Sequence, residues 1–380
     1  MIYVGIDVAK ETHYAAVMDD NNNVLVKPFD FTNDAVGFAK LISKLTSFPK
    51  EKLLFGLEST GIYSENLIAF LYDSGFSIAV INPIQTATLR KTGIRKTKTD
   101  KTDTLLIIKS LMVNPYHLYT RQDAVTMKLK SSCRYRQNLK KSKARLKIQL
   151  SAYVNMVFPE LQNFFKSGIH IATCYELLKM CPSPAEIAAL RIDKLSKLLS
   201  KASHGRFGKS SAEALKSLAK TSVGVKNPYI FIQITQTIAS IELLEQQIEE
   251  IETLIEETMK ELDSVIMTIP GIGAMDGAMI LGEIGDISRF ASASKLLAYA
   301  GLDPTVCQSG NFRARSTKMS KRGSKTLRFA LINAAWQLTL HSDVFKAYYD
   351  LKRSAGLGHY AALGHVAHKL VRVLFKLLRS

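Results

Sequence analysis

The first hundred residues show two different spacings of apolar positions. Five segments have the two-residue period, or the short apolar run, that is typical of β-strands. These predicted strands cover residues 1–9, 13–20, 24–31, 53–59 and 76–83. Between them, residues 31–45 and 63–75 have apolar positions at helical spacing, and Thr32 or Asn33 is placed to cap the first of these helices. Three strands followed by alternating helices and strands predict an α/β fold with a mixed sheet.

Beyond the sheet the pattern is helical. Residues 100–112 predict one helix, 124–159 a long one, and 160–225 several short capped helices to which we assign no chemistry. In residues 230–263 an apolar residue recurs every seven positions, which is the spacing of a coiled-coil seam. Its members are Ile234, Ile241, Ile248, Ile255 and Leu262.

The outer face of this heptad helix is acidic, whereas the helix over 124–159 is basic and contains no acid. Opposite charges favour pairing of the two helices, either within one chain or between protomers. We hypothesise that the heptad helix dimerises the protein. A helical hairpin inside a single chain fits the pattern equally well.

A short glycine motif, P-G-I-G at 270–273, follows the heptad helix. Between two helices this motif is typical of a helix-hairpin-helix, in which backbone N–H groups approach a phosphate. A plain turn is the alternative.

The composition narrows the class of protein. A formal charge of +18 in a chain that is 47% apolar suits a polyanionic partner, with nucleic acid as the first candidate and an anionic membrane surface as the second. The four cysteines have no C-x-x-C spacing, so neither a zinc site nor a disulfide framework is indicated. With no secretory leader and no apolar run of membrane-spanning length, we expect a soluble protein of a reducing cytosol.

Four acids occupy positions that suit the binding of metal ions. Asp7 ends the first strand, Glu58 ends the fourth, and Asp100 and Asp103 share a face at the start of a helix. Converging carboxylates require cations, and oxygen ligands of this kind suit Mg²⁺ or Mn²⁺, which would clamp a phosphodiester. Separate solvated acids are the alternative. An actin-like sugar kinase or ATPase is a rival fold, although we find none of its repeated glycine-rich phosphate loops.

The bases concentrate around the aspartate pair, in the helix over 124–159, and between residues 304 and 342. Such density favours contact with backbone phosphates, which positions nucleic acid without reading its sequence. The candidate contacts are Lys96, Lys98, Lys128, Lys130, Arg134, Arg136, Lys140, Lys141, Arg313, Arg315, Lys318, Lys321 and Arg322. Ser309 lies in the predicted loop Q-S-G-N, just before the last run. Most serines in such loops only form turns, but a serine hydroxyl attacks phosphorus when nearby cations stabilise the oxyanion.

Taken together, these motifs resemble a known family. The G-I-D strand, L-E-S-T-G, K-T-D-x-x-D, the heptad helix, P-G-I-G, A-G-L-x-P, Q-S-G and S-K-R-G-x-x-x-L-R are similar to the DEDD-type transposases of bacterial insertion-sequence family one hundred and ten. The resemblance covers residues 1–115 and 265–335. One departure is Thr104, where alanine commonly follows the second aspartate of the family's pair, and it leaves the ligand assignment intact.

The element order, which is typical of a ribonuclease H-like domain, and the resemblance together predict an α/β plus α protein with three domains. These are a RuvC-like ribonuclease H-fold domain at 1–125, a helical and coiled-coil linker region at 126–264, and a mainly helical C-terminal transposase domain at 265–380 that holds the catalytic serine.

The resemblance further implies site residues and partners. Asp7, Glu58, Asp100 and Asp103 match the family's metal ligands, and Ser309 matches the serine that forms a phosphoserine link to DNA. Members act on donor and target DNA, guided by a noncoding bridge RNA, as a homo-oligomer in which a dimer assembles to a tetramer. We therefore predict a Mg²⁺- or Mn²⁺-dependent recombinase of the bacterial cytosol or nucleoid. A Holliday-junction-type metal-dependent endonuclease, with water as nucleophile, and a noncatalytic nucleic-acid-binding protein are the alternatives.

Overall fold

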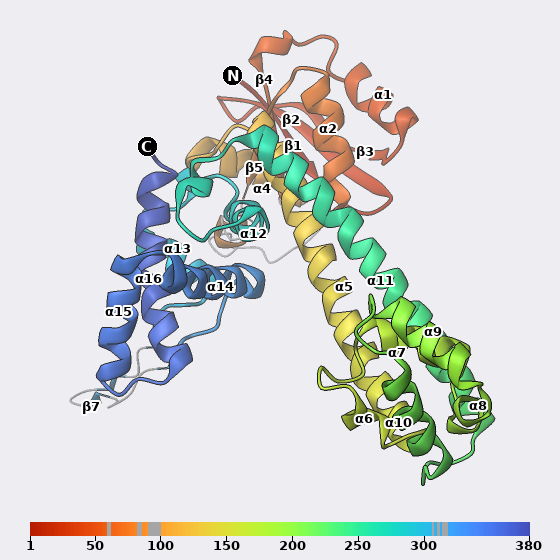
Figure 1. Cartoon of the computed structure of the whole chain (residues 1–380). Coiled ribbons are helices and arrows are strands. Elements are labelled where there is room, and N and C mark those ends of the chain that lie inside the picture. Colours follow the sequence, from red (N-terminus) through yellow and green to blue (C-terminus); the bar gives the residue numbers. More distant parts are fainter. Residues whose placement is uncertain (59–61, 82–85, 90–99, 306–307, 310–311, 314–317) are drawn as a thin grey trace. The chain divides into compact units, whose positions relative to one another are not determined.

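The chain forms two compact units, Met1–Ala124 and Val125–Ser380 (Figure 1). The computed structural model describes residues 1–58, 62–81, 86–89, 100–305, 308–309, 312–313 and 318–380, and the side chains of Ile62, Asp100, Gln308, Ser309, Phe312 and Arg313 lie outside this description. The first unit ends one residue before the first predicted domain does. The other two predicted domains lie together in the second unit.

The first unit is built on a mixed sheet of five strands in the order β3-β2-β1-β4-β5. The strands are β1 (Ile2–Asp7), β2 (Thr12–Asp19), β3 (Val24–Thr32), β4 (Leu53–Glu58) and β5 (Ser77–Ile81). β2 pairs antiparallel with β1 and β3, whereas β4 pairs parallel with β1 and β5. The predicted mixed sheet is confirmed by these pairings, and β4, which is a continuous apolar run, is buried at five successive residues.

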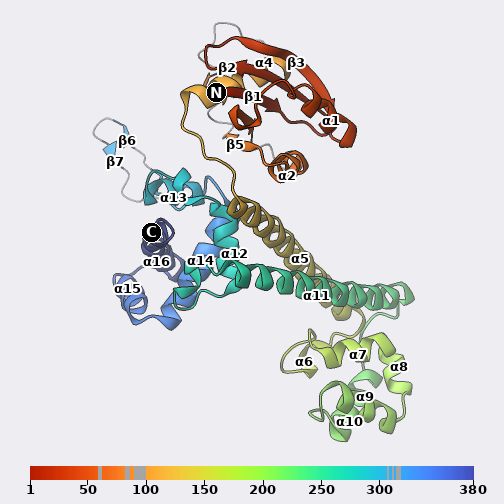
Figure 2. The same cartoon turned by 90° about the horizontal axis from the view of Figure 1, so that it is seen from above.

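Helices cover both faces of the sheet, as Figure 2 shows for α2 and α4. The helical segments are α1 (Ala35–Ser43), η1 (Lys50–Lys52), η2 (Ile62–Ser64), α2 (Glu65–Asp73) and α4 (Asp100–Val113). Val4 and Ile6 of β1 pack in one core cluster with Phe38 of α1 and Leu67 of α2. The alternate residues of each strand face α4, so the period of β1 assigns Gly5 and Asp7 to the α4 side.

The cap of α1 differs from the prediction. Asp34 is the N-cap, and its carboxylate accepts a hydrogen bond of 2.8 Å from the Gly37 amide. Thr32 instead donates its hydroxyl to Asp34 at 2.7 Å. The cap lies beyond Thr32 and Asn33 because β3 continues through Thr32.

The second unit is helical apart from a two-residue strand pair. Its elements are α5 (Arg121–Val157, which starts in the first unit), α6 (Leu161–Phe164), α7 (Ala172–Met180), α8 (Pro184–Ala189), α9 (Ile192–Ala202), α10 (Lys209–Lys220), α11 (Pro228–Leu262), η3 (Val265–Thr268), α12 (Ala274–Ile284), η4 (Ile287–Arg289), α13 (Ala293–Ala300), β6 (Gln308–Ser309), β7 (Phe312–Arg313), α14 (Lys325–His341), α15 (Asp343–Ser354) and α16 (His359–Leu377). No helix in the described part of the chain is long and apolar enough to cross a membrane.

The helices α5 and α11 lie side by side and run antiparallel (Figures 1 and 2). Arg136 of α5 pairs with Glu252 at 2.5 Å, and Lys143, further along α5, pairs with the earlier Glu245 at 3.4 Å. Four of the five heptad residues, Ile234 to Ile255, are at most 5% exposed within this one chain. The hairpin alternative is therefore correct for these two helices, and the apolar seam that we assigned to dimerisation is already covered by the chain itself.

The P-G-I-G motif forms a tight turn between η3 and α12. Gly271 has φ +80°, and a Cβ there would lie 3.0 Å from the Gln337 carbonyl oxygen of α14. Both facts require glycine for packing inside the protein. The role of this turn in phosphate binding remains a prediction.

Candidate functional site

Asp7 and Glu58 lie at one edge of the sheet because two parallel strands end there in register. Gly5 of β1 lies opposite Gly56 of β4, and Ile6 lies opposite Leu57. Asp7 and Glu58 each follow one residue later as the last residues of their strands. Because strand neighbours lie about 5 Å apart and side chains alternate, both acids emerge side by side on the α4 face.

Helix α4 approaches this face very closely. A Cβ on Gly5 would lie 2.3 Å from the Thr104 carbonyl oxygen, and a Cβ on Gly56 would lie 2.5 Å from Leu111. Because these two residues have no side chains, α4 packs directly against the backbone of β1 and β4. Any larger residue two positions before either acid would displace α4.

The direction of α4 brings its first turn to the acids. Tyr3, at the start of β1, packs beside the core cluster of Ile108, together with Met112 in the last turn of α4. The helix thus begins toward the ends of β1 and β4. Asp103 lies there with only 8% of its surface exposed, and Asp100, one turn earlier, has its side chain outside the described residues.

Two residues near the acids were not identified from the sequence. Thr86, which is 2% exposed, donates its hydroxyl to Glu58 Oε1. Tyr14 of β2 lies opposite Asp7 in the antiparallel register, and the pairing places it on the same face. Thr86 follows a segment outside the description, and Tyr14 differs from other strand residues only in its register.

The donor set is suited to a divalent cation in its chemistry. All of the candidates are carboxylates, the hard oxygen ligands that Mg²⁺ and Mn²⁺ prefer. Within the described side chains, no three His, Cys, Asp or Glu residues form a group close enough to hold a metal ion. The fourth predicted ligand, Asp100, lies outside that search.

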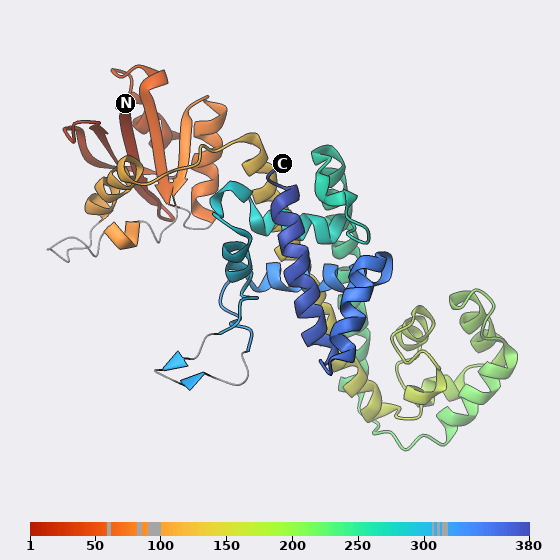
Figure 3. The same ribbon diagram turned by 90° about the vertical axis from the view of Figure 1, so that its left-hand side faces the viewer.

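Ser309 lies on β6, which pairs antiparallel with β7 and places Ser309 opposite Phe312. Figure 3 shows these two short strands extending away from the helices of the second unit. The side chain of Ser309 lies outside the described residues. The segment that contains Ser309 lies between α13, which ends at Ala300, and α14, which begins at Lys325.

The two ends of that segment are clamped together. The Thr305 amide donates to the Lys318 carbonyl at 2.8 Å, and the Ser320 amide donates to the Asp303 carbonyl at 2.8 Å. The Ser320 hydroxyl also donates to the Asp303 carboxylate. We call residues 301–305 and 318–324 the clamped stem.

A buried carboxylate ties the clamped stem to the long basic helix. Glu283 of α12 is 1% exposed and accepts two hydrogen bonds from the Arg134 guanidinium, at 2.6 and 3.0 Å. It also accepts one from Ser324 Oγ at 2.7 Å, and Ser324 in turn caps α14. Burial raises the pKa of the Glu283 carboxyl, but the bonds from Arg134 and Ser324 outweigh it and hold that pKa below its ordinary value. The sequence did not reveal Glu283, because its main partner is 149 residues away.

Three predicted nucleic-acid contacts on α5 have partners inside the chain. Arg134 binds Glu283, while Arg136 and Lys140 both bind Glu252, at 2.5 and 3.0 Å. Contact of these three residues with nucleic acid stays a prediction, since Arg134 and Lys140 keep about half of their side-chain surface exposed. Two carboxylates within the protein nevertheless already pair with them and offset part of their charge. The local sequence could not reveal this because the acids lie more than a hundred residues away.

The other predicted contacts fall into two groups. Lys128, Lys141, Lys318, Lys321 and Arg322 are exposed, and Lys130 is half-buried where α5 packs against Gly282 of α12. These residues form no ion pair with another described residue. The remaining four, Lys96, Lys98, Arg313 and Arg315, lie wholly or by their side chains outside the described residues.

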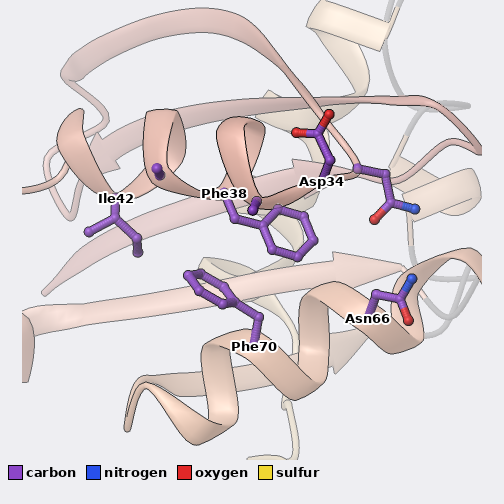
Figure 4. A pocket seen from close by; sticks show the side chains of 8 residues that line it. Asp34, Phe38, Ile42, Asn66 and Phe70 are labelled. Atoms are coloured by element: carbon purple, nitrogen blue, oxygen red, sulfur yellow. The ribbon is translucent and has the colours of Figure 1, made fainter.

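A pocket of about 600 Å³ lies on the other face of the sheet, between α1 and α2 (Figure 4). Phe38 and Phe70 line it, with ring centroids 4.9 Å apart. Its carboxylate, Asp34, is occupied as the cap of α1. We assign no chemistry to this pocket, because the candidate acids Asp7 and Glu58 lie on the opposite face.

Two family models match the chain. One, described as Transposase, matches residues 4–159, and the other, described as Transposase IS116/IS110/IS902 family, matches residues 263–350. The first match includes the four acids. The second includes Ser309, Glu283 and the clamped stem.

Individual relatives agree with the models. The "Mini-circle putative transposase for IS117" of Streptomyces coelicolor is 24% identical over 100% of this chain and 94% of its own. The "Pilin gene-inverting protein" of Moraxella bovis is 26% identical over 88% of this chain and 81% of its own. A solved structure, "T. thermophilus RuvC in complex with Holliday junction substrate", covers 31% of this chain and 99% of its own at 14% identity, but its TM-score of 0.24 is too low to define the fold here. Since models of one family match both ends and a relative matches the whole length, the chain belongs to the IS116/IS110/IS902 family of transposases, enzymes that cut and rejoin DNA.

Proposed function

We propose that this transposase cuts DNA with a divalent cation held by Asp7, Glu58, Asp100 and Asp103. The observation that supports the proposal is that Asp7 and Glu58 end two adjacent parallel strands, and that α4, with Asp103 in its first turn, packs on the same face of the sheet. A ribonuclease H-like fold, as the strand order suggests, would use this edge in the same way. A Mg²⁺ or Mn²⁺ ion bound there would neutralise the carboxylates and polarise the phosphodiester.

Ser309 is the proposed nucleophile. Its Oγ forms a new ester bond to phosphorus, the bond from phosphorus to the leaving deoxyribose oxygen breaks, and the serine proton is passed on while the leaving oxygen gains one. The number of phosphate ester bonds is unchanged. The strand can therefore be rejoined without an external energy source, which suits an enzyme that rejoins what it cuts.

The finer features of the family also enter as proposals. We propose that a noncoding bridge RNA selects donor and target DNA by base pairing, and that the protein acts as a dimer that assembles to a tetramer. The acids of one protomer would then work with the serine of another. Five exposed bases suit contact with the phosphates of this RNA and DNA, since surface lysine and arginine bind phosphates regardless of sequence. They are Lys128, Lys141, Lys318, Lys321 and Arg322.

Alanine substitution tests the two chemical roles separately. We expect Ser309→Ala to abolish cleavage of DNA that spans the ends of the element, while the affinity for that DNA changes less than about threefold. Asp7→Ala and Glu58→Ala should abolish cleavage in the same way. A Ser309→Ala protein that still cleaves would contradict the serine mechanism.

The metal-dependent endonuclease is the second candidate function, favoured by the fact that the four acids alone would support it. In that case Ser309→Ala retains activity, Asp7→Ala does not, and the product carries no protein. A noncatalytic nucleic-acid-binding protein would show no cleavage in any variant, including the unsubstituted protein.

A further inference from the structure

The helices α6 to α10, inserted between α5 and α11, include a basic face that no proposed chemistry uses. Lys194, Lys197 and Lys201 follow one side of α9 at helical spacing, and all three are exposed. Leu195 and Leu199, on the opposite side, are fully buried in the core that the insertion shares with α5 and α11. One side of α9 is thus fixed by packing, and the other presents cations to solvent.

Three further exposed bases follow in the turn between α9 and α10 and at the start of α10. His204, Arg206 and Lys209 are exposed there, and no acid occurs between Asp193 and Glu213. We define the α9 basic face as Lys194, Lys197, Lys201, His204, Arg206 and Lys209.

Hydrogen bonds hold the turn in a fixed shape. The Gly205 amide donates to the Ser200 carbonyl at 2.8 Å, and the Phe207 amide donates to Ser203 Oγ at 2.9 Å. The Phe207 ring packs against Phe165 with centroids 5.2 Å apart. The cations of the turn are therefore carried on an ordered backbone, so little ordering entropy is lost when they bind a ligand.

Several bases of the second unit are matched by acids, and those of this face are not. On α5, Lys143 and Lys147 bind Glu245. In the insertion itself, Lys179 binds Glu242 at 2.8 Å. Within the described part of the chain, no residue of the α9 basic face forms an ion pair. Like charges three and four residues apart on one helix face repel each other, and a bound polyanion relieves that repulsion.

We propose that the α9 basic face is a binding site for the phosphate backbone of the DNA duplex on which the transposase acts. The positive charge of the face favours a polyanion. Because the chain belongs to a transposase family, DNA is the polyanion that it must bind. Apart from His204, the face offers only lysine and arginine, with no exposed asparagine or glutamine, so we expect it to contact phosphates without reading bases. The inference depends on DNA as substrate, but it does not depend on the acid and serine chemistry.

A matched pair of triple variants tests the site. One replaces Lys194, Lys197 and Lys201 with Gln. The control replaces Lys166, Lys220 and Lys226, which are exposed lysines of the same insertion outside the face. Affinity for a fluorescently labelled DNA duplex is measured by anisotropy over a range of KCl concentrations, with an RNA duplex of equal length in parallel.

We expect the face variant to bind the DNA duplex about tenfold to a hundredfold more weakly, and to lower the slope of log affinity against log salt by about 0.9 for each lost phosphate contact. A DNA duplex of unrelated sequence should lose the same factor, and the control variant should stay near the unsubstituted protein. Equal DNA binding by the two triple variants would overturn the proposal, as would a loss confined to RNA. Equal thermal unfolding midpoints show that both variants fold. Because the readout is binding, it stands whether or not Ser309 proves to be the nucleophile.

Discussion

The two regions that carry the candidate chemistry are held in place by different forces. The acids lie at a sheet edge where Gly5 and Gly56 let α4 pack directly on the strands. Ser309 lies on a segment whose clamped stem is fixed by hydrogen bonds and by the buried Glu283. The first arrangement depends on close packing of backbone and apolar side chains. The second depends on satisfied polar groups, and it is therefore the one that should respond to pH.

The largest expected effect comes from breaking the packing of the acid edge. Gly5→Val would drive a side chain into the Thr104 carbonyl, and we expect a loss of stability of about 3 kcal/mol in the first unit, because overpacking forces the backbone apart. Hydrogen exchange of peptides from β1 and α4 should rise, and DNA cleavage should fall with it. As a control, Gly208→Ala should change neither, since a Cβ there meets nothing within 4 Å. Unchanged exchange in Gly5→Val would refute the packing account.

Removing the partner of Glu283 should affect the serine-bearing region next most strongly. Arg134→Met leaves the buried Glu283 carboxylate with only the Ser324 hydroxyl as a hydrogen-bond donor among the described residues, and we expect a loss of about 2 kcal/mol. Hydrogen exchange should increase in α12 and at the start of α14. Lys128→Met, on the same helix but exposed and without an ion pair among the described residues, is the matched control. Similar exchange in the two variants would mean that Glu283 does not hold the stem.

Acid should weaken the second region through the same carboxyl. The pKa of Glu283 is lower in the folded chain than its ordinary value, so ionised Glu283 stabilises the fold above that value, and the contribution is lost as the pH falls through the folded pKa. We expect the urea midpoint to fall from about pH 7 to about pH 4 by more in the unsubstituted protein than in Glu283→Gln. Parallel falls in both proteins would contradict this assignment.

The smallest expected effect concerns the stem itself. Ser320→Ala removes the hydroxyl bond to Asp303 and should cost about 1 kcal/mol. Because the stem presents Ser309, the rate of DNA cleavage should fall while DNA affinity is kept. Ser354→Ala, which removes an exposed serine bond at the end of α15, should leave that rate unchanged. A cleavage rate that falls equally in both variants would argue against a positioning role.

Much of the first region was predictable from the sequence because its order is local. Apolar periodicity locates the strands, and strand ends and helical spacing put Asp7 and Glu58 at the ends of β1 and β4 and Asp103 in the first turn of α4, as the structure has them. The close packing of α4 on Gly5 and Gly56 was not predicted, because the sequence around a strand glycine does not show what packs against it.

The second region was less predictable because its determinants are distant in sequence. Glu283 lies in the short sequence G-E-I-G, which has no local mark of a buried ion pair, and Arg134 looked like one more base of a nucleic-acid-binding run. Heptad spacing identified the apolar seam of α11 correctly but did not show whether another chain or α5 covers it. Charge density alone likewise did not separate the paired bases of α5 from the unpaired ones of α9.

The central claim is that Ser309 becomes joined to DNA in a reaction that needs the acid edge. The direct measurement is to incubate the protein with Mg²⁺, its copurifying RNA and labelled DNA that spans the ends of its element, then to map any protein–DNA adduct that survives denaturation by mass spectrometry. We predict an adduct on Ser309 that disappears with EDTA and in Asp7→Ala. Cleaved DNA with no adduct would contradict the account, because water would then be the nucleophile.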